Sequence, residues 1–189
     1  MRMRFGRRFF GFCAGLLICC AAVLGTTLEK MPLERMADVA RVIVRARCVS
    51  NSTGWDAGEI WTFTTFEVAE TWKGLATDRV TVRLLGGTVG SLTSTVSGVP
   101  RFRTGEEVVL FLEPTTRGDF TVVSWQQGTF RVGRDPRNGA QIVTQDTAAF
   151  ETFDTRTRQF KASGIRDLPL EAFRARVQAA VAESARRKS

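Results

Sequence analysis

Residues 98–114 read GVPRFRTGEEVVLFLEP, and the apolar run VVLFL at residues 108–112 decides the fold. A run rich in valine, preceded by a glycine turn and followed by a proline, is typical of a β-strand. Successive side chains of a strand point to opposite faces of the sheet. An uninterrupted apolar run therefore predicts a central strand that is covered on both sides.

Two adjacent carboxylates, Glu106 and Glu107, precede this run. Neighbours on a strand point to opposite faces, so the pair cannot flank one bond as the acid and base of a hydrolase. We interpret them as the solvated end of the strand. The loop before them is the better candidate for a functional segment, and its predicted interaction residues are Ser97, Val99, Pro100, Arg101, Phe102 and Arg103.

Alternation of apolar and polar residues surrounds this strand on both sides. The long run at residues 59–74 predicts a curved or bulged strand, and such curvature closes small barrels. Residues 51–58 and 86–105 have loop composition. We predict a mostly β fold, a small OB-like antiparallel barrel of five to six strands, with strands at residues 40–50, 59–74, 79–85, 106–114, 119–125, 128–132 and 140–145.

Helical patterns lie at both ends of the β region. Residues 26–40 predict a short N-terminal helix. Residues 167–189 predict an amphipathic C-terminal helix, with Asp167 as its N-cap and Pro169 in its first turn. The apolar face of the C-terminal helix should consist of Leu170, Phe173, Val177 and Val181.

The first 25 residues predict an export segment, because a basic start is followed by an apolar stretch and then by small residues suited to cleavage. The apolar stretch is shorter than the ~20 residues that span a bilayer, so cleavage is favoured and an uncleaved inner-membrane anchor is the alternative. We expect a signal peptide at 1–25, a β-barrel domain with the short helix at 26–155, and a basic C-terminal helix at 156–189. The location would be periplasmic or secreted.

Residue usage narrows the function further. The chain of 189 residues has a net charge of +8, but its basic residues gather at the two ends, so no nucleic-acid partner is expected. It has no histidine, and a cleaved chain keeps only Cys48 of its four cysteines, which we expect to be a buried thiol. We therefore predict a protein that is not an enzyme, with no catalytic residue, no metal and no cofactor.

Short motifs resemble known families. Residues 40–49 (ARVIVRARCV), 66–74 (FEVAETWKG) and 105–112 (GEEVVLFL) resemble the framework of netrin-like, tissue-inhibitor-of-metalloproteinases-like domains, which implies an OB fold. Residues 96–112 (VSGVPRFRTGEEVVLFL) look like the V-S-G-x-P-x-F-x-x-G-E-E-x-V-L-F-L segment of uncharacterised exported bacterial proteins. The tissue inhibitors of metalloproteinases chelate zinc through an N-terminal cysteine. A mature chain that begins near Thr26 has no such cysteine, so the netrin-like resemblance implies a fold and not that mechanism.

Our leading hypothesis is an exported, non-catalytic binding or interaction module of the cell envelope. Its partner would be an exported protein, with membrane contact only through an uncleaved N-terminal segment. One alternative is a protein inhibitor or accessory factor of a co-exported protease, which would present the loop around Val99, Pro100 and Phe102 to a cleft. A second alternative is binding of an anionic polymer or oligonucleotide, with tryptophans and arginines on an OB-like face.

Overall fold

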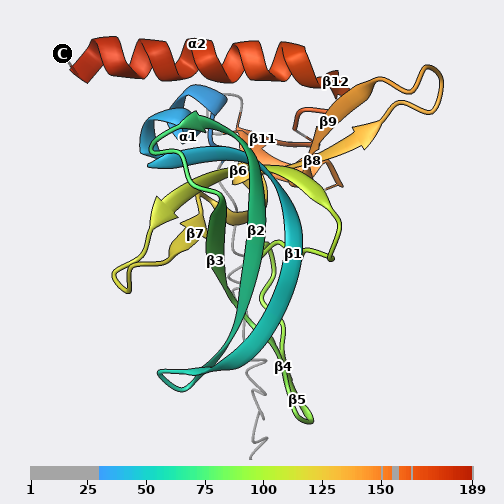
Figure 1. Ribbon diagram of the computed structural model, residues 1–189. Helices are drawn as coiled ribbons and strands as arrows, with labels where there is room; N and C mark the ends of the chain where they lie inside the picture. Colours follow the sequence, from blue (N-terminus) through green and yellow to red (C-terminus); the bar gives the residue numbers. More distant parts are fainter. Residues whose placement is uncertain (1–29, 150, 155–157, 163, 189) are drawn as a thin grey trace, which may run out of the picture.

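The computed structural model describes residues 30–149, 151–154, 158–162 and 164–188, so the predicted export segment lies outside it. A mostly β chain with a helix towards each end is confirmed (Figure 1). In chain order the elements are α1 (Leu33–Val39), β1 (Val42–Asp56), β2 (Glu59–Lys73), β3 (Arg79–Leu85), β4 (Gly87–Val89), β5 (Leu92–Ser94), β6 (Glu107–Pro114), β7 (Phe120–Val122), a 3-10 turn (Trp125–Gly128), β8 (Thr129–Arg134), β9 (Gln141–Gln145), a second 3-10 turn (Asp146–Ala149), β10 (Glu151–Asp154), β11 (Gln159–Ala162), β12 (Leu168–Pro169) and α2 (Leu170–Lys188).

Five of these strands close into a ring. They pair in the order β1-β2-β3-β7-β6, and β6 pairs back with β1. The pairing between β3 and β7 is parallel, and the other four are antiparallel. The sheet continues from β6 through β8, β9 and β12, so β6 belongs to both the ring and its extension. Cys48 is buried inside the ring, as predicted.

Strand β6 is covered on both faces, which confirms the prediction from its sequence. Val108, Leu110 and Leu112 pack inside the ring against side chains of β1, β2 and β3. Val109 and Phe111 belong to a separate cluster outside the ring, to which α1 and α2 contribute. All five side chains are completely buried.

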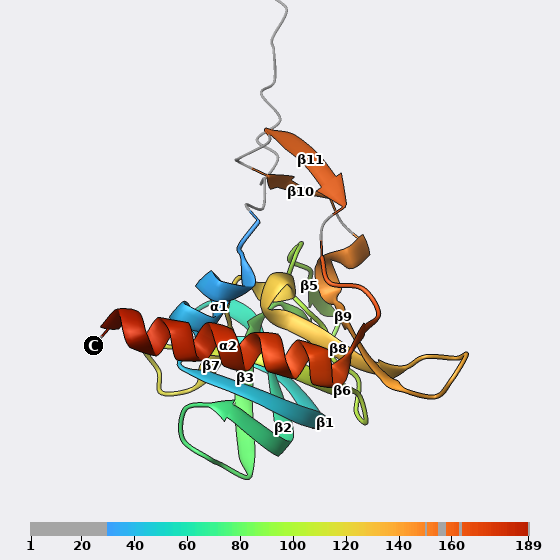
Figure 2. The same cartoon turned by 90° about the horizontal axis from the view of Figure 1, so that it is seen from above.

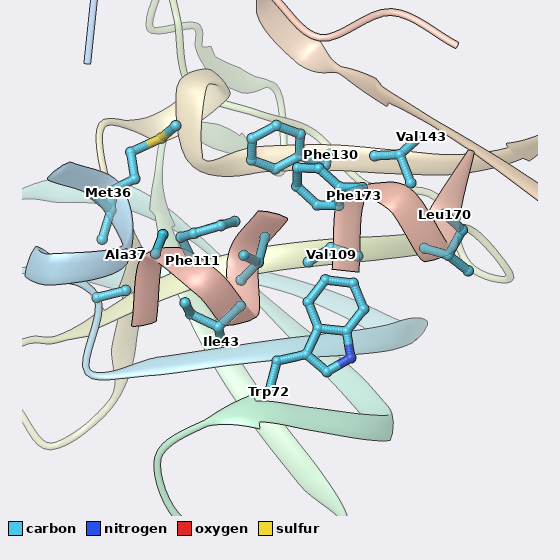
Figure 3. Close-up of a cluster of buried hydrophobic side chains, with 14 residues drawn as sticks. Met36, Ala37, Ile43, Trp72, Val109, Phe111, Phe130, Val143, Leu170 and Phe173 are labelled. Carbon is cyan, nitrogen blue, oxygen red and sulfur yellow. The ribbon is translucent and has the colours of Figure 1, made fainter. Parts of the chain in front are cut away.

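The outer cluster holds α2 across the sheet (Figures 2 and 3). The ring of Phe173 lies 4.6 Å from that of Phe130 on β8 and 6.1 Å from that of Trp72 on β2, measured between centroids. Val181 is only partly buried. The other residues predicted for the apolar face of this helix are confirmed as buried, namely Leu170, Phe173 and Val177.

Strands β1 and β2 form one long hairpin, so the loop predicted at residues 51–58 is wrong. Residues 51–56 continue β1, and Ala57 and Gly58 make the turn with φ angles of +50° and +82°. Two positive φ angles characterise the tight turns that suit twisted hairpins. The composition is polar because much of this arm is exposed. The strand register shifts at three places, and two of these shifts leave an extra residue in β2, which confirms the bulges predicted for residues 59–74.

Two further strand boundaries differ from the sequence prediction. Residues 86–105 contain the short hairpin of β4 and β5, where a loop alone was expected. The strand expected at residues 119–125 ends at Val122, because Ser124 and Trp125 both have left-handed φ angles and lead into a 3-10 turn.

Both helices are shorter than their sequence patterns. The described part of the N-terminal helix begins at Leu33, and residues before 30 lie outside the structure's description. Asp167 is not the N-cap of α2, because its carboxylate accepts a hydrogen bond from Thr144 and the next two residues pair with β9 as β12. The region expected at 156–189 as one helix therefore also contains strands.

Replacing Phe173 by alanine should lower the free energy of unfolding by about 3–5 kcal/mol, because it empties the centre of the outer cluster. The matched control is Gln178→Ala on the exposed side of the same helix, which should change it by less than about 0.5 kcal/mol. Urea unfolding followed by tryptophan fluorescence measures both. A loss below about 1 kcal/mol for Phe173→Ala would show that α2 is not part of the cooperative core.

Candidate functional site

The predicted interaction loop does not present its apolar residues to solvent. Val99, Pro100 and Phe102 are buried. The Phe102 ring meets the Phe66 ring edge-on inside the closed ring of strands, with 5.0 Å between centroids. The expectation that these three side chains form a contact surface is therefore wrong, because they complete the core.

The polar residues of the same loop reach solvent: Ser97, Arg101 and Arg103 are exposed. Arg101 folds back across the junction of β3 and β4, where its Nη1 donates to Oγ1 of Thr62 at 3.0 Å and to the Gly86 carbonyl at 3.1 Å. A Cβ at position 86 would lie 2.6 Å from Arg101 Nη2, and φ is +87° there. Glycine is thus required for the guanidinium to approach the backbone.

Glu106 and Glu107 are ion-paired, and the interpretation of simple solvated charge is incomplete. Nη1 of Arg131 donates to Glu106 at 2.5 Å, and its Nε donates to Asp146 at 2.6 Å. Nε of Arg45 donates to Glu107 at 2.5 Å. Burial alone lowers the pKa of Arg131, but its bonds to Asp146 and the charges of both carboxylates raise that pKa overall. The two glutamates thus form ion pairs with different arginines.

The outer face of β2 and β3 carries an arginine on an aromatic platform. The Arg83 guanidinium lies 4.2 Å above the Trp61 ring, and Arg83 is only 4% exposed. It hydrogen-bonds to Asp56 and lies 3.7 Å from Asp119. Trp72, which the oligonucleotide alternative would need as a stacking surface, is buried beneath α2. The positive charge of this face is therefore already compensated.

A cleft of about 950 Å³ opens where the two helices meet one end of the ring. Its walls come from the end of α1, the turn between β2 and β3, the start of β7 and the last turns of α2. Both its volume and its apolar character match those of small-ligand pockets. The apolar side chains of its lining include Val39, Ala40, Val42, Val80, Phe120 and Val181.

The charged residues that line this cleft are four cations and two carboxylates. The ammonium group of Lys73 is already hydrogen-bonded within the protein, because its Nζ donates to backbone carbonyls at the end of α1, the nearest at 2.5 Å. Burial, and then the charges of Lys188 and Arg41, lower the pKa of Lys73. Arg41 and Arg79 are exposed, and neither has an ion-pair partner within the described part of the chain.

The two helices are joined at this cleft by Asp38. Its carboxylate accepts hydrogen bonds from Ser184 Oγ at 2.6 Å and from Lys188 Nζ at 2.7 Å, both on α2. These bonds, from Lys188 and then Ser184, lower the pKa of Asp38 from 3.8 to about 2. The contact spans almost the whole sequence, so pattern reasoning along the chain had no signal for it.

Comparison with models of known protein families gives no match, and comparison with curated proteins gives none. Within the described residues, no group of three or more acidic or cysteine side chains is placed to hold a metal ion. No helix in the same part of the chain is long and apolar enough to cross a membrane.

Replacing Asp38 by asparagine should lower the urea midpoint at neutral pH, because α1 and α2 lose their charged contact. The folded-state pKa of Asp38 is about 2 and its ordinary value is 3.8, so its contribution is complete above pH ~4 and is lost as the pH falls towards 2. The midpoints of wild type and variant should therefore converge at pH 2.

The control is Asp78→Asn, since Asp78 is exposed and lies in the turn before β3. Its midpoint should follow the wild type at both pH values. A difference between Asp38→Asn and wild type that is equally large at pH 7 and pH 2 would contradict the ionic contact.

Proposed function

We propose that this chain is an exported, non-catalytic binding module of the cell envelope, built on an OB-like barrel, and that its ligand is a small amphipathic anion. The observation that carries the proposal is the cleft at the helical end of the ring. It combines apolar walls with Arg41 and Arg79, whose charges have no partner in the described chain.

The OB-like barrel is supported by the pairing order of the ring. OB folds are five-stranded Greek-key barrels, and here five strands pair in a closed order with one parallel contact. Export is supported by the order of basic, apolar and small residues in the first 25 positions. A binding role without catalysis is supported by the absence of histidine from the sequence.

The ligand class follows from the lining of the cleft. Apolar walls favour an acyl chain or ring system, since burial of apolar surface provides about 25 cal/mol per Å². Arg41 and Arg79 favour an anionic head group at the rim. Exposed ion pairs contribute only about 0.2–1 kcal/mol each, so the apolar part provides most of the affinity and the arginines set orientation and selectivity.

The alternatives lose support from particular contacts. A protease inhibitor would need Val99, Pro100 and Phe102 at its surface, yet all three are buried. An oligonucleotide face would need several free cations along one groove, but Arg83 is bound by two aspartates and Arg45 by two glutamates. The lining of the cleft favours a small ligand over an exported protein partner.

The purified protein should bind 11-(dansylamino)undecanoate, an acyl chain with a carboxylate, and enhance its fluorescence in a saturable way. Ala185→Trp should weaken binding at least tenfold because Ala185 lines the cleft and a tryptophan would fill it. Ala182→Trp, on the exposed surface of the same helix, should bind within twofold of wild type. No binding by the wild type, or equal binding by both variants, would contradict the proposal.

The charge requirement is tested with the methyl ester of the same probe. Arg41→Gln and Arg79→Gln should each weaken binding of the carboxylate about two- to fivefold, as expected for exposed ion pairs, and leave the ester unaffected. The matched control is Arg176→Gln, which removes the same charge from α2 outside the cleft. Equal losses for the acid and the ester would argue against an anionic ligand.

A further inference from the structure

A second cavity of about 480 Å³ lies at the opposite end of the ring from the cleft. Strand β3 shows the separation, because Val80 near its start lines the cleft and Leu84 near its end lines the cavity. The walls of the cavity come from the arm of the β1–β2 hairpin, the β4–β5 hairpin and the predicted interaction loop. Figure 1 shows the β4–β5 hairpin beside this arm. Nothing in the proposed ligand site uses these residues.

Hydroxyl groups dominate the lining of this cavity. More than half of its residues are threonine or serine, and they include Thr53, Thr62, Thr64, Thr88, Thr93 and Thr95. Thr62 and Thr64 are buried. The bulge in β1 produces this face, because after the register shift beyond Cys48 the residues Asn51 and Thr53 lie opposite Thr64 and Thr62.

Several hydroxyl protons in the cavity are used within the protein. Thr62 Oγ1 donates to the Gly86 carbonyl at 2.6 Å, and Thr64 Oγ1 donates to Asn51 Oδ1 at 2.6 Å. Thr53 Oγ1 donates to the Thr88 carbonyl at 2.5 Å. A hydroxyl oxygen that has given its proton still accepts hydrogen bonds. Thr62 and Thr64 form the buried floor of the cavity, whereas Thr53, Thr88, Thr93 and Thr95 are exposed and offer acceptor oxygens to a ligand rich in O–H donors.

Arg101 is the single charged residue among those that line the cavity. Its Nη1 makes two hydrogen bonds to Thr62 and Gly86, and its Nη2 makes one to the Leu85 carbonyl. Nε and one N–H of Nη2 thus have no acceptor in the described chain. Burial lowers the pKa of Arg101, and no carboxylate of the described residues lies near enough to oppose this shift. A guanidinium fork suits a bidentate anion.

We propose that this cavity binds a carbohydrate acid, with Arg101 on the ligand carboxylate and the threonine oxygens accepting hydrogen bonds from its hydroxyl groups. The face continues to Trp55, which lies opposite Ile60 and two residues beyond Thr53 on β1. Trp55 is 55% exposed, so its indole is a flat apolar surface on which the next sugar ring stacks. The site thus takes a short acidic oligosaccharide.

Nucleic acid fits this cavity poorly. A nucleic-acid groove follows its strand with several cations, and the lining here has one. DNA also lacks the sugar hydroxyl groups that would donate hydrogen bonds to the threonine oxygens. An inorganic anion would use Arg101 alone and leave the hydroxyl face without a role.

Isothermal titration calorimetry with tetragalacturonate, maltotetraose, sodium sulfate and an eight-residue oligothymidylate tests the proposal on the purified protein. Tetragalacturonate should bind with one site per chain, at least tenfold more tightly than any of the other three. Failure to bind it, equal binding of neutral maltotetraose, or equal binding of sulfate or oligothymidylate would each overturn the proposal.

Variants locate the site. Arg101→Gln should weaken tetragalacturonate binding at least tenfold, and so should Thr95→Glu, which places a carboxylate in the cavity at an exposed position where folding is not at risk. Trp55→Ala should weaken binding of the tetramer more than that of galacturonate. The matched control is Arg103→Gln, which removes an exposed charge two residues away and outside the lining, and should bind within twofold of wild type.

Equal weakening by Arg103→Gln and Arg101→Gln would overturn the assignment in favour of diffuse charge attraction. Undiminished binding by Thr95→Glu would show that the ligand does not enter this cavity and would also overturn the assignment. The dansylundecanoate assay reports on the other end of the ring, so each variant should keep its acyl-probe binding.

Discussion

The burial of both faces of β6 is the constraint on which the rest of the structure depends. A strand whose five central side chains are all apolar cannot leave either face in water, and each such side chain contributes about 1.5–3 kcal/mol when fully buried. The inner face is buried when β1, β2, β3 and β7 close into a ring with β6. The outer face is satisfied by α1 and α2, which explains why a mostly β chain keeps a long helix at its end.

Closure of the ring leaves its two ends with different chemistry. At one end the helices approach the strands and enclose an apolar cleft, whose wall is fixed by the contact of Asp38 with α2. At the other end the bulged arm of β1 and β2 carries threonines beyond the apolar core and meets the β4–β5 hairpin around Arg101. One architecture thus presents an apolar cleft and a hydroxyl-lined cavity, which have no lining residue in common.

The features predicted correctly from the sequence are those that the local spacing of apolar residues determines. The two-sided run of β6 and the buried face of α2 both follow from periodicity. The polar arm at residues 51–56 was missed because exposed strands and loops share a composition. Phe102 was misplaced because a loop between glycine and proline gives no sign that its aromatic side chain enters the core. The cleft and the cavity combine residues distant in the chain, and no pattern along one segment could indicate them.

Native-state hydrogen exchange in increasing urea tests the central role of β6 most directly. If both cores depend on this strand, the amides of Val108–Leu112 should exchange only through global unfolding, with the same free energy and urea dependence as the whole chain. The amides of β1 and β8 paired with them should merge with that same unfolding. Exchange of the β6 amides through a partial opening, while either the ring or the α2 face stayed protected, would contradict the account.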